Sequence, residues 1–432
     1  MKNIFIWSKL PPFKRFSETE IIRDDLLENN VGNLLFRTAV ARALMVDAGQ
    51  AFYTKRDVPP DLNEAWLEEI NSRCACMVLP LANAFRASYM GQLEFITRLI
   101  EKLKIPCVVV GVGIQCESAE QLQRGFAFDD TVRRFVNVVL EHSAMLGLRG
   151  EFTAAYLEHL GYIPEKHYRV IGCPSMFSFG ANLPRLEMGN IDACARVCIN
   201  TKSAASRPIH AFMQRSCKAL PNYSYIPQTI QELRLLNLGA PLLQSRQWRL
   251  RRDFDYFPLS RGSALVKEGR VKEVFDADAW IDYMRSFDLT YGCNIHGNIA
   301  SILAGTPAVV IARDLRVTEI ARYFEIPTVA PNMLADKTIL DVLDGLDFSG
   351  INRHHAERFE RYTDFLKANE LENIYALPRQ TSPTPFDIRR AEVKPLTLLD
   401  PPRRLGMARR ALGADLTRRS ITGALSRRLK RK

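Results

Sequence analysis

Apolar and polar positions follow two different patterns, which alternate along most of the chain. Short runs of β-branched and apolar residues are separated by segments whose apolar positions recur every three or four residues. The 93–103 segment, for example, places five aliphatic side chains on one helical face. This alternation predicts α/β architecture with largely parallel sheets. In the first half, the strand-length runs cover residues 3–7, 75–81, 107–111, 145–148 and 168–171.

The same alternation resumes after a stretch punctuated by Gly and Pro, residues 172–189. It predicts strands at 196–200, 223–227, 289–291 and 308–312, and helices at 277–285, 297–303, 317–324 and 352–369. We therefore expect two doubly wound, Rossmann-like domains facing each other across a cleft, with ligands at the carboxyl ends of the strands. The expected boundaries are 1–185 for the N-terminal domain, 190–375 for the C-terminal domain, and 376–432 for a linker and basic tail.

Residues 241–274 interrupt this rhythm with a polar, basic and aromatic sequence. The composition favours a solvated surface loop. The alternative is a flap that covers the cleft or holds an acidic or sugar ligand.

Composition narrows the class of protein. The chain has 432 residues, 47% hydrophobic and 25% charged, as in an ordinary globular protein. No apolar run approaches the roughly 18 residues of a membrane-spanning helix, and the N-terminus turns polar too soon for a secretory signal. We expect a cytoplasmic protein.

The net charge of +11 is concentrated at the C-terminal end. Residues 401–432 hold eleven Lys and Arg against one acid, so this segment carries +10 and the rest of the chain +1. No specific nucleic-acid binding is expected of the body. Residues 403–432 space Leu, Ile and Ala three to five apart among arginine pairs, which favours a helix that lies on an anionic membrane surface. A disordered charged tail, or one that contacts RNA non-specifically, is the alternative.

The nine cysteines show neither a disulfide framework nor zinc-site spacing. Buried, reduced thiols account for them better than a metal site does. We expect no metal ion and no cofactor.

The 275–327 segment carries the strongest chemical signal. His296, Gly297 and Asn298 open a helix directly after a strand, beside backbone N–H groups that attract anions. The next strand leads into Arg313, Asp314, Arg316 and Glu319 at the same edge of the sheet. One imidazole, two cations and carboxylates at such an edge suit acid–base chemistry on a phosphorylated or carboxylated substrate. The alternatives are a capping or core histidine, a capping acid and a surface ion pair.

The first half of the chain contains further candidates for ligand-binding residues. The 145–148 strand delivers Arg149, which could clamp a carboxylate or phosphate with two hydrogen bonds or pair with Glu151 or Glu158. Glycine turns that let backbone approach a ligand bring in Gly113 and Ser175. Gly32 and Asn33 open a helix near the first strand.

Several of these segments together resemble one known family. Residues 148–157 (LRGEFTAAYL), 172–175 (GCPS), 280–281 (WI), 295–298 (IHGN), 304–311 (AGTPAVVI) and 314–319 (DLRVTE) occur in the order found in polysaccharide pyruvyl transferases, over about residues 29–330. The resemblance implies a fold like that of the two-domain GT-B glycosyltransferases. It also implies phosphoenolpyruvate as donor, a sugar hydroxyl pair of a polysaccharide or lipid-linked glycan as acceptor, and a pyruvate ketal as product.

The resemblance also assigns roles. His296 and Arg149 match positions implicated in catalysis and donor binding. We expect His296 to act as general acid and base, and the substrate to contact Gly32, Asn33, Gly113, Ser175, Asn294, Gly297, Asn298, Asp314, Arg316 and Glu319. Two residues depart from the family pattern: Asn294 stands where many members carry Arg, and Cys173 where many carry an acid. A nucleotide-sugar glycosyltransferase of the same architecture and a non-catalytic polysaccharide-assembly protein remain the alternatives.

Overall fold

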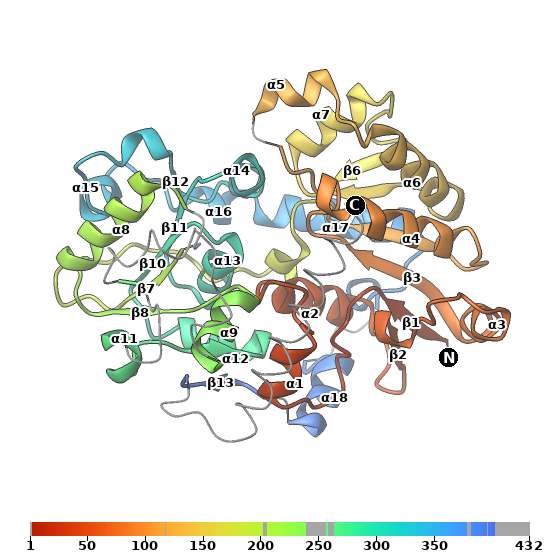
Figure 1. The fold of residues 1–432 in the computed structure, drawn as a ribbon, viewed down its shortest axis with the longest axis horizontal. Helices are drawn as coiled ribbons and strands as arrows, with labels where there is room; N and C mark the ends of the chain where they lie inside the picture. The colour runs from red at the N-terminus through yellow and green to blue at the C-terminus, as the bar shows by residue number, and fades with distance from the viewer. Residues whose placement is uncertain are drawn as a thin grey trace, which may run out of the picture.

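The computed structural model describes residues 2–116, 118–201, 205–238, 256–257, 263–377, 382–394 and 396–401. These residues form two parallel β-sheets that lie side by side, with helix α2 (Asn33–Leu44) between them (Figure 1). The expected α/β class and the two Rossmann-like domains are confirmed.

The first sheet has the strand order β2-β1-β3-β4, and all of its pairs are parallel. A parallel bridge between Val112 and Leu148 continues it into the β5-β6 pair. The strands are β1 (Asn3–Ile6), β2 (Phe52–Thr54), β3 (Cys74–Pro80), β4 (Cys107–Val110), β5 (Leu146–Leu148) and β6 (Tyr168–Val170).

The second sheet has the order β12-β11-β10-β7-β8 and is also parallel throughout. A separate antiparallel pair joins β9 and β13. The strands are β7 (Val197–Asn200), β8 (Tyr223–Tyr225), β9 (Glu273–Val274), β10 (Leu289–Gly292), β11 (Ala308–Ile311), β12 (Thr328–Val329) and β13 (Leu398–Leu399). All nine strands expected from the sequence are present within two residues of their expected ends.

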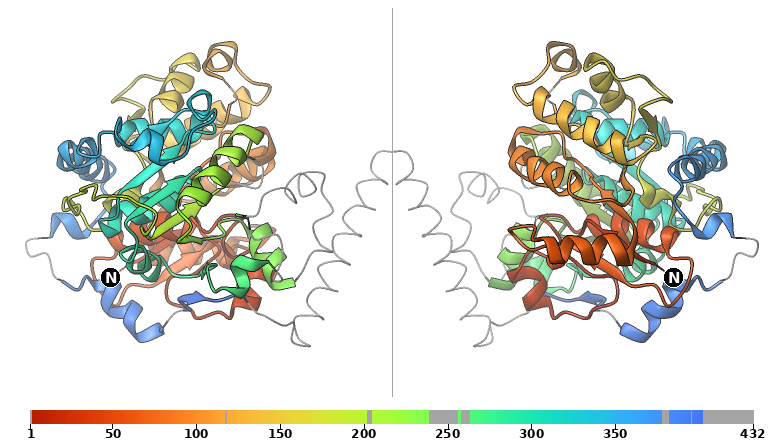
Figure 2. Two further views of the ribbon diagram at one scale, coloured as in Figure 1. Left: turned by 90° about the vertical axis from the view of Figure 1, so that its left-hand side faces the viewer. Right: turned by 90° about the vertical axis from the view of Figure 1, so that its right-hand side faces the viewer.

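Helices cover the faces of both sheets. In the right-hand view of Figure 2, α3, α4 and α6 lie on the outer face of the first sheet. The first-domain helices are α1 (Glu18–Arg23), α2, α3 (Glu64–Arg73), α4 (Met90–Ile100), α5 (Ala119–Arg124), α6 (Asp129–His142) and α7 (Glu151–His159). The second-domain helices are α8 (Arg207–Ala219), α9 (Ile230–Leu238), α11 (Ala264–Lys267), α12 (Ala277–Met284), α13 (Ile295–Ala304), α14 (Leu315–Tyr323) and α15 (Leu340–Leu343).

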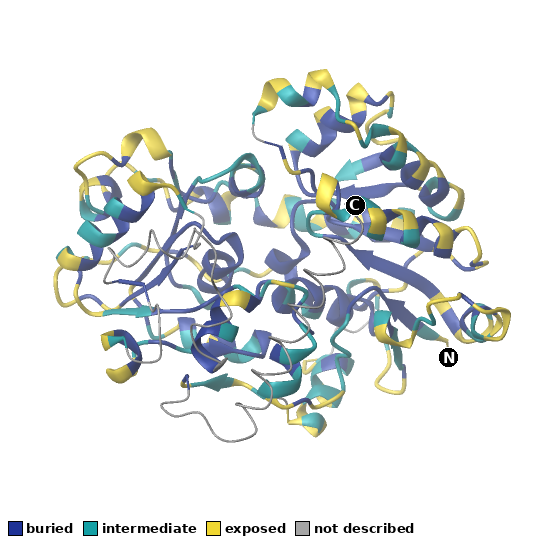
Figure 3. Ribbon diagram, viewed as in Figure 1, coloured by how far each residue is buried: buried dark blue, intermediate teal, exposed yellow. Residues whose placement is uncertain are grey.

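The apolar residues form three layers, because successive strand residues point to opposite faces of a sheet. In β3, Met77 packs with the outer helices, whereas Val78 packs toward the middle of the molecule. In β11, Val310 joins the same middle layer, and Val309 joins the far one. Both sheets are therefore buried on both faces, and the exposed residues are concentrated on helices and loops (Figure 3).

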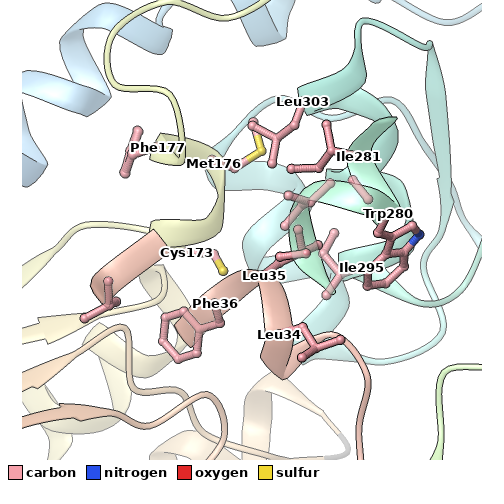
Figure 4. Packing of buried hydrophobic residues seen from close by; sticks show 14 of the residues in the cluster. Leu34, Leu35, Phe36, Cys173, Met176, Phe177, Trp280, Ile281, Ile295 and Leu303 are labelled. Atoms are coloured by element: carbon pink, nitrogen blue, oxygen red, sulfur yellow. The ribbon is translucent and has the colours of Figure 1, made fainter. Parts of the chain in front are cut away.

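The middle layer is shared by the two domains. It joins α2 to η3 (Pro174–Phe177), and both of these to α12 and α13 of the second domain. Leu35 of α2, Met176 of η3 and Ile281 of α12 lie in this one cluster (Figure 4). The domains are thus packed on each other rather than joined by a linker alone.

The chain returns to the first domain after the second sheet. The expected 352–369 helix is divided into α16 (Gly350–Arg353) and α17 (His355–Ala368). Arg361 Nε of α17 donates to the carbonyl of Val170 in β6 over 2.8 Å. Within the segment expected to be a linker, α18 (Pro385–Val393) packs on α2, where Arg42 pairs with Asp387 at 2.9 Å.

Further expectations can be compared with the described residues. None of the described helices is long and apolar enough to cross a membrane. All nine cysteines are free and eight are buried, but Cys194 is exposed, contrary to expectation, because it follows the turn at Asp192 on the surface. Residues 402–432, which hold nearly all of the basic tail, lie outside the described residues, as do most of residues 241–262.

Candidate active site

A cavity of about 380 Å³ lies between the domains, at the carboxyl ends of strands from both sheets. Trp7 follows β1, Gln115 follows β4 and Arg149 follows β5, while His296 and Arg316 come from the strand ends of the second sheet. Parallel strands place their carboxyl ends at one edge, so residues distant in sequence converge there. The other lining residues are Glu28, Asn29, Asn30, Asn33, Phe36, Arg37, Pro80, Leu81, Ala82, Asn83, Ala84, Arg86, Tyr89, Gln228, Thr229, Gln231, Asn294 and Ile295.

Arg149 is the most unusual side chain of this cleft. It is only 2% exposed, and its Nε and Nη2 have no hydrogen-bond partner among the described residues. The expected alternative, an ion pair with Glu151 or Glu158, is not among the salt bridges of the described residues. The pKa of Arg149 is lowered to about 10, chiefly because burial disfavours the charged form, and the charge of Arg316 acts in the same direction. A buried guanidinium without a partner is stabilised by an anion that enters the cleft.

Arg37, Arg86 and Arg316 also line the cleft, and Arg37 pairs with Glu28. Arg316, in the first turn of α14, lies 3.7 Å from the carboxylate of Asp314. Arg86 follows β3 and precedes η2 (Ala87–Tyr89), and its Nε donates to Ser88 Oγ over 3.2 Å. Burial lowers the pKa of both guanidinium groups, and Arg316 contributes to the lowering at Arg86. The charge of Arg316 therefore acts on both Arg86 and Arg149.

His296 occupies the first turn of α13 and is 9% exposed. Its Nε2 lies 3.7 Å from Cys173 Sγ, on the turn that leads into η3. The ring packs directly against Gly32, because a Cβ at that glycine would lie 2.4 Å from His296 Nδ1. The imidazole is therefore held between two elements of the first domain while it belongs to the second.

Buried amides surround the histidine. Asn294 donates from Nδ2 to the carbonyl of Thr201, whereas its Oδ1 has no partner among the described residues. Gln228 is 1% exposed, lines the cleft, and lacks a described partner at both Oε1 and Nε2. Such groups are usually satisfied in a native protein. Their arrangement leaves hydrogen-bonding capacity available to a polar ligand.

The expected helix N-termini are present at the cleft. Gly32 is the N-cap of α2, and Asn294 is the N-cap of α13; neither provides a side-chain capping bond to the first helical N–H groups. Asn33 lines the cavity and anchors itself by Nδ2 to the carbonyl of Leu27 at 2.9 Å. At α2, the N–H groups of Asn33 and Leu34 donate to the carbonyls of Asn30 and Val31, so these two groups are not available to an anion.

Asp314 and Glu319 have structural contacts outside the lining of the cavity. Asp314 caps α14 by accepting from the Val317 N–H at 3.0 Å. Glu319 is 3% exposed and accepts from the Thr153 N–H of α7 at 2.6 Å. Burial raises the pKa of Glu319 to about 7, while the Thr153 N–H opposes that rise. Both acids thus hold the elements that carry the arginines.

The remaining expected residues lie behind the cavity wall. Gly113 backs onto Arg149, since a Cβ there would lie 3.2 Å from Arg149 Cδ. Ser175 accepts from Cys173 Sγ at 3.3 Å. Gly297 leaves room for Gln228, and buried Asn298 donates to the carbonyl of Gly292 at 3.2 Å. These four support cleft residues rather than lining the cavity.

Arg86, Gln228 and Glu28 line the cavity but were not expected from the sequence. Arg86 and Gln228 each follow a predicted strand, so the rule that ligands lie at strand ends could have found them. Glu28 carried no such signal, because it precedes α2 in a loop. There it accepts from the Lys9 N–H at 3.2 Å and pairs with Arg37.

The cleft thus combines an imidazole, several arginines, the N-termini of two helices and several amides with spare hydrogen-bonding capacity. It can bind an anion with more than one acidic group and transfer a proton beside it. Within the described residues, no three His, Cys, Asp or Glu side chains gather closely enough to hold a metal ion.

Comparison with solved structures gives distant likenesses only. Anabaena HepE in complex with UDP and glucose is 13% identical, with 86% of this chain and 97% of that chain covered and a TM-score of 0.42. The Neisseria meningitidis UDP-GlcNAc 2-epimerase bound to UDP-GlcNAc is 10% identical, with 91% and 98% covered and a TM-score of 0.38. The glycosyltransferase SnogD from Streptomyces nogalater is 13% identical, with 86% and 98% covered and a TM-score of 0.33. A search of curated proteins found no match.

Comparison with family models gives a match over most of the chain. The model described as polysaccharide pyruvyl transferase matches residues 30–314. This range begins just before α2 and ends at the cap of α14, so it contains Gly32, Arg149 and His296. The chain belongs to the polysaccharide pyruvyl transferase family.

Proposed function

We propose that this protein transfers the pyruvyl group of phosphoenolpyruvate to two hydroxyls of one sugar, forming a cyclic ketal and releasing phosphate. The acceptor sugar belongs to a cell-surface polysaccharide or to a lipid-linked glycan precursor. The observation that carries this proposal is the buried guanidinium of Arg149, without a described partner, in the same cleft as His296.

The donor requires charge neutralisation at two places. Phosphoenolpyruvate carries a carboxylate and a phosphate on the same carbon. In a buried cleft, where water is largely excluded, cationic side chains stabilise both of these anionic groups. Arg149 binds one of the two groups with its planar fork, and Arg316 binds the other. These cations supply the positive charge that an Arg in place of Asn294 provides in other members.

The chemistry requires proton transfer at carbon and at oxygen. Protonation of the donor methylene creates positive charge on the carbon that bears the phosphate, and a sugar hydroxyl attacks that carbon while losing its proton. The second hydroxyl then displaces phosphate, which leaves with that proton. His296 donates the first proton and accepts the one released by the attacking hydroxyl. A neutral acceptor with many hydroxyls fits the amides of the cleft, Asn83, Gln115 and Gln231 among them.

Ligand-dependent stabilisation tests the donor first. A ligand at about 100 times its Kd stabilises the folded state by about 2.7 kcal/mol. We expect phosphoenolpyruvate to raise Tm of the wild type and not of Arg149→Ala. Calorimetry should likewise show a higher affinity for phosphoenolpyruvate in the wild type than in Arg149→Ala. Arg134→Ala, which removes an exposed arginine paired with Glu101 away from the cleft, is the control.

The same experiment separates the alternatives. Stabilisation by a UDP- or GDP-sugar instead of phosphoenolpyruvate identifies a glycosyltransferase. Silence from all of these ligands, with and without a glycan acceptor, leaves the non-catalytic assembly role. Retention of near-full turnover by His296→Ala contradicts the role given to the imidazole.

The basic segment 403–432 supports a second, separate proposal about location. Its arginine pairs and spaced apolar residues suit an anionic lipid surface, where a lipid-linked acceptor resides. We expect the full chain to sediment with anionic vesicles, and a chain shortened to residues 1–401 to stay in the supernatant. Equal sedimentation of both forms contradicts this location.

A further inference from the structure

The side-chain amide of Gln228 is buried at the boundary between the two domains. The residue is 1% exposed and lines the cleft, yet neither Oε1 nor Nε2 has a hydrogen-bond partner among the described residues. An amide in this position loses its hydrogen bonds to water without replacement, which is costly. Native proteins rarely leave such groups unpaired, so this amide indicates a ligand that supplies the missing bonds.

The backbone of Gln228 is held on both sides. Its N–H donates to the carboxylate of Glu232 over 3.0 Å, and its carbonyl accepts from the Val31 N–H of the first domain over 3.0 Å. Glu232 also accepts from the N–H and from the hydroxyl of Thr229, each at 2.8 Å. The side chain therefore extends from a fixed backbone, which reduces the entropy lost when a ligand binds.

The amide of Gln228 lies against the first turn of α13. A Cβ at Gly297 would be 2.3 Å from Gln228 Nε2 and 3.0 Å from Asn200 Nδ2, so this glycine lets both amides pack on the helix. Asn200 Oδ1 accepts from the Asn294 N–H at 2.7 Å, whereas Asn200 Nδ2 has no described partner. Three buried amides, those of Asn200, Gln228 and Asn294, thus meet around one helical turn.

The orientation of the Asn294 amide is fixed by its own hydrogen bond. Its Nδ2 donates to the carbonyl of Thr201 over 2.9 Å, so Oδ1, which has no described partner, can only accept. An amide turned the other way would place its oxygen against that carbonyl. Asn294 also lines the cleft. A ligand that satisfies Asn294 must therefore carry a hydrogen-bond donor.

This requirement distinguishes the two substrates. The carboxylate and the ionised phosphate of phosphoenolpyruvate have acceptor oxygens and no donor, so they cannot pair with the oxygen of Asn294 or of Gln228. A sugar hydroxyl both donates and accepts, and two neighbouring hydroxyls match the oxygen and the NH₂ group of one amide. The amide end of the cleft consequently suits a neutral, hydroxylated ligand, whereas Arg149 and Arg316 suit the anionic one.

We propose that Gln228 is a specificity-determining residue: its amide binds a pair of hydroxyls of the acceptor sugar, while Asn294 Oδ1 accepts from a further hydroxyl. This inference rests on the proposed function for the reaction that follows binding. A sugar that lacks one of these hydroxyls leaves buried polar atoms unpaired, so the cleft rejects it strongly. The donor binds at the arginines and does not contact Gln228.

Two buried glutamines give a matched pair for a test without any ligand. Gln50 is 3% exposed, and its amide accepts from the Val46 N–H at 2.9 Å and donates to the carbonyl of Lys2 at 3.2 Å. We expect Gln50→Met to lower Tm, and Gln228→Met to leave Tm unchanged or to raise it. A comparable fall in Tm in both variants would show that Gln228 is bonded within the protein, directly or through an enclosed water, and would overturn the proposal.

Ligand-observed NMR then tests sugar binding directly. The probes are the methyl glycosides of glucose, galactose, mannose and N-acetylglucosamine, added without phosphoenolpyruvate. We expect at least one glycoside to bind the wild type, with an affinity at least about tenfold lower in Gln228→Met. The calorimetric affinity for phosphoenolpyruvate should be the same in both proteins. Equal glycoside affinity in the two proteins, or no binding of any glycoside, overturns the proposal.

Glycine substitutions provide a second pair of variants. The methyl group of Gly297→Ala displaces the flexible end of the Gln228 side chain, so the helix itself can stay in place. A Cβ at Gly91, in the first turn of α4, meets nothing within 4 Å. We expect Gly297→Ala to lose glycoside affinity as Gln228→Met does, and Gly91→Ala to keep it. Equal glycoside affinity of the two alanine variants contradicts the proposal.

These outcomes can be told apart from a failure of the proposed function. Glycoside binding that depends on Gln228, in a protein that does not bind phosphoenolpyruvate, keeps the hydroxyl subsite and rejects the donor. Binding of phosphoenolpyruvate that depends on Arg149, with a glycoside affinity that does not depend on Gln228, keeps the donor and rejects the subsite. With an acceptor that turns over, Gln228→Met should raise KM for the acceptor and leave KM for phosphoenolpyruvate unchanged.

Discussion

The carboxylate of Glu319, in α14, accepts a hydrogen bond of 2.6 Å from the backbone N–H of Thr153, in α7. A side chain of the second domain thus caps a helix of the first. The N-cap of α7 is Gly150, which has no side chain for this purpose, and a Cβ there would lie 2.3 Å from Glu319 Cγ. The helix that follows Arg149 is therefore held in place from across the domain boundary.

Glu319 should make stability depend on pH. Burial raises the pKa of its folded-state carboxyl to about 7, from an ordinary value of 4.5. The folded state therefore binds more protons than the unfolded state between these two values, and the free energy of unfolding falls as pH rises through that window. We expect urea unfolding to show this decrease between pH 5 and pH 8, with Glu319→Gln removing about 2–3 kcal/mol of it.

Glu187→Gln is the control for this measurement. Its side chain is largely exposed and pairs with Arg185 at the surface, so this substitution should leave the pH dependence of unfolding as in the wild type. A Glu319→Gln variant with the wild-type pH dependence would show that the buried carboxyl does not titrate in this window.

Arg149→Met should stabilise the protein and abolish donor binding. The arginine buries a charge without a described partner, whereas methionine fills similar space without a charge. We expect the free energy of unfolding of the ligand-free protein to rise by about 1–3 kcal/mol, and affinity for phosphoenolpyruvate to fall at least tenfold. Denaturant titration and calorimetry measure the two quantities independently.

Arg42→Met should destabilise the protein, in contrast to Arg149→Met. Arg42 is equally buried but is bound by Asp278 at 2.7 Å and Asp387 at 2.9 Å, which join α2 to α12 and α18. Its removal leaves two carboxylates without their cation, and we expect a loss of about 2–4 kcal/mol. Destabilisation by both methionine variants would mean that Arg149 is a structural residue.

Asp314→Asn should strengthen anion binding. An asparagine keeps the capping bond to the Val317 N–H, so α14 stays in place, but it removes the negative charge 3.7 Å from Arg316. We expect inorganic phosphate to bind several-fold more tightly, with a steeper dependence on ionic strength. Calorimetry at two salt concentrations measures this affinity. An unchanged phosphate affinity would show that Arg316 does not contribute to the anion site.

The sequence pattern identified the strands because both sheets are buried on both faces. Runs such as Cys107–Val110 are continuous and apolar, which is readily recognised. The edge strand β2 (Phe52–Thr54) escaped detection because it is three residues long and half-buried. Helix α18 escaped because its contacts with α2 span more than 300 residues, as in the pair Arg42 and Asp387.

Site residues could be predicted where the position of a single residue in the sequence, directly after a predicted strand, indicated its role. His296 and Arg149 each follow a strand and line the cleft as expected. The contacts that define their chemistry join distant segments, and the sequence gives no measure of them. Cys173 meets His296 across 123 residues, and Glu319 meets Thr153 across 166.

The shared middle layer has a consequence for how ligands reach the cleft. Because α2 and η3 of the first domain pack into the same apolar cluster as α12 and α13 of the second, the halves cannot swing apart without exposing that cluster to water. The two walls of the cleft are consequently preorganised. Donor binding then requires no domain closure, so the affinity for the donor is not reduced by the free-energy cost of such a movement.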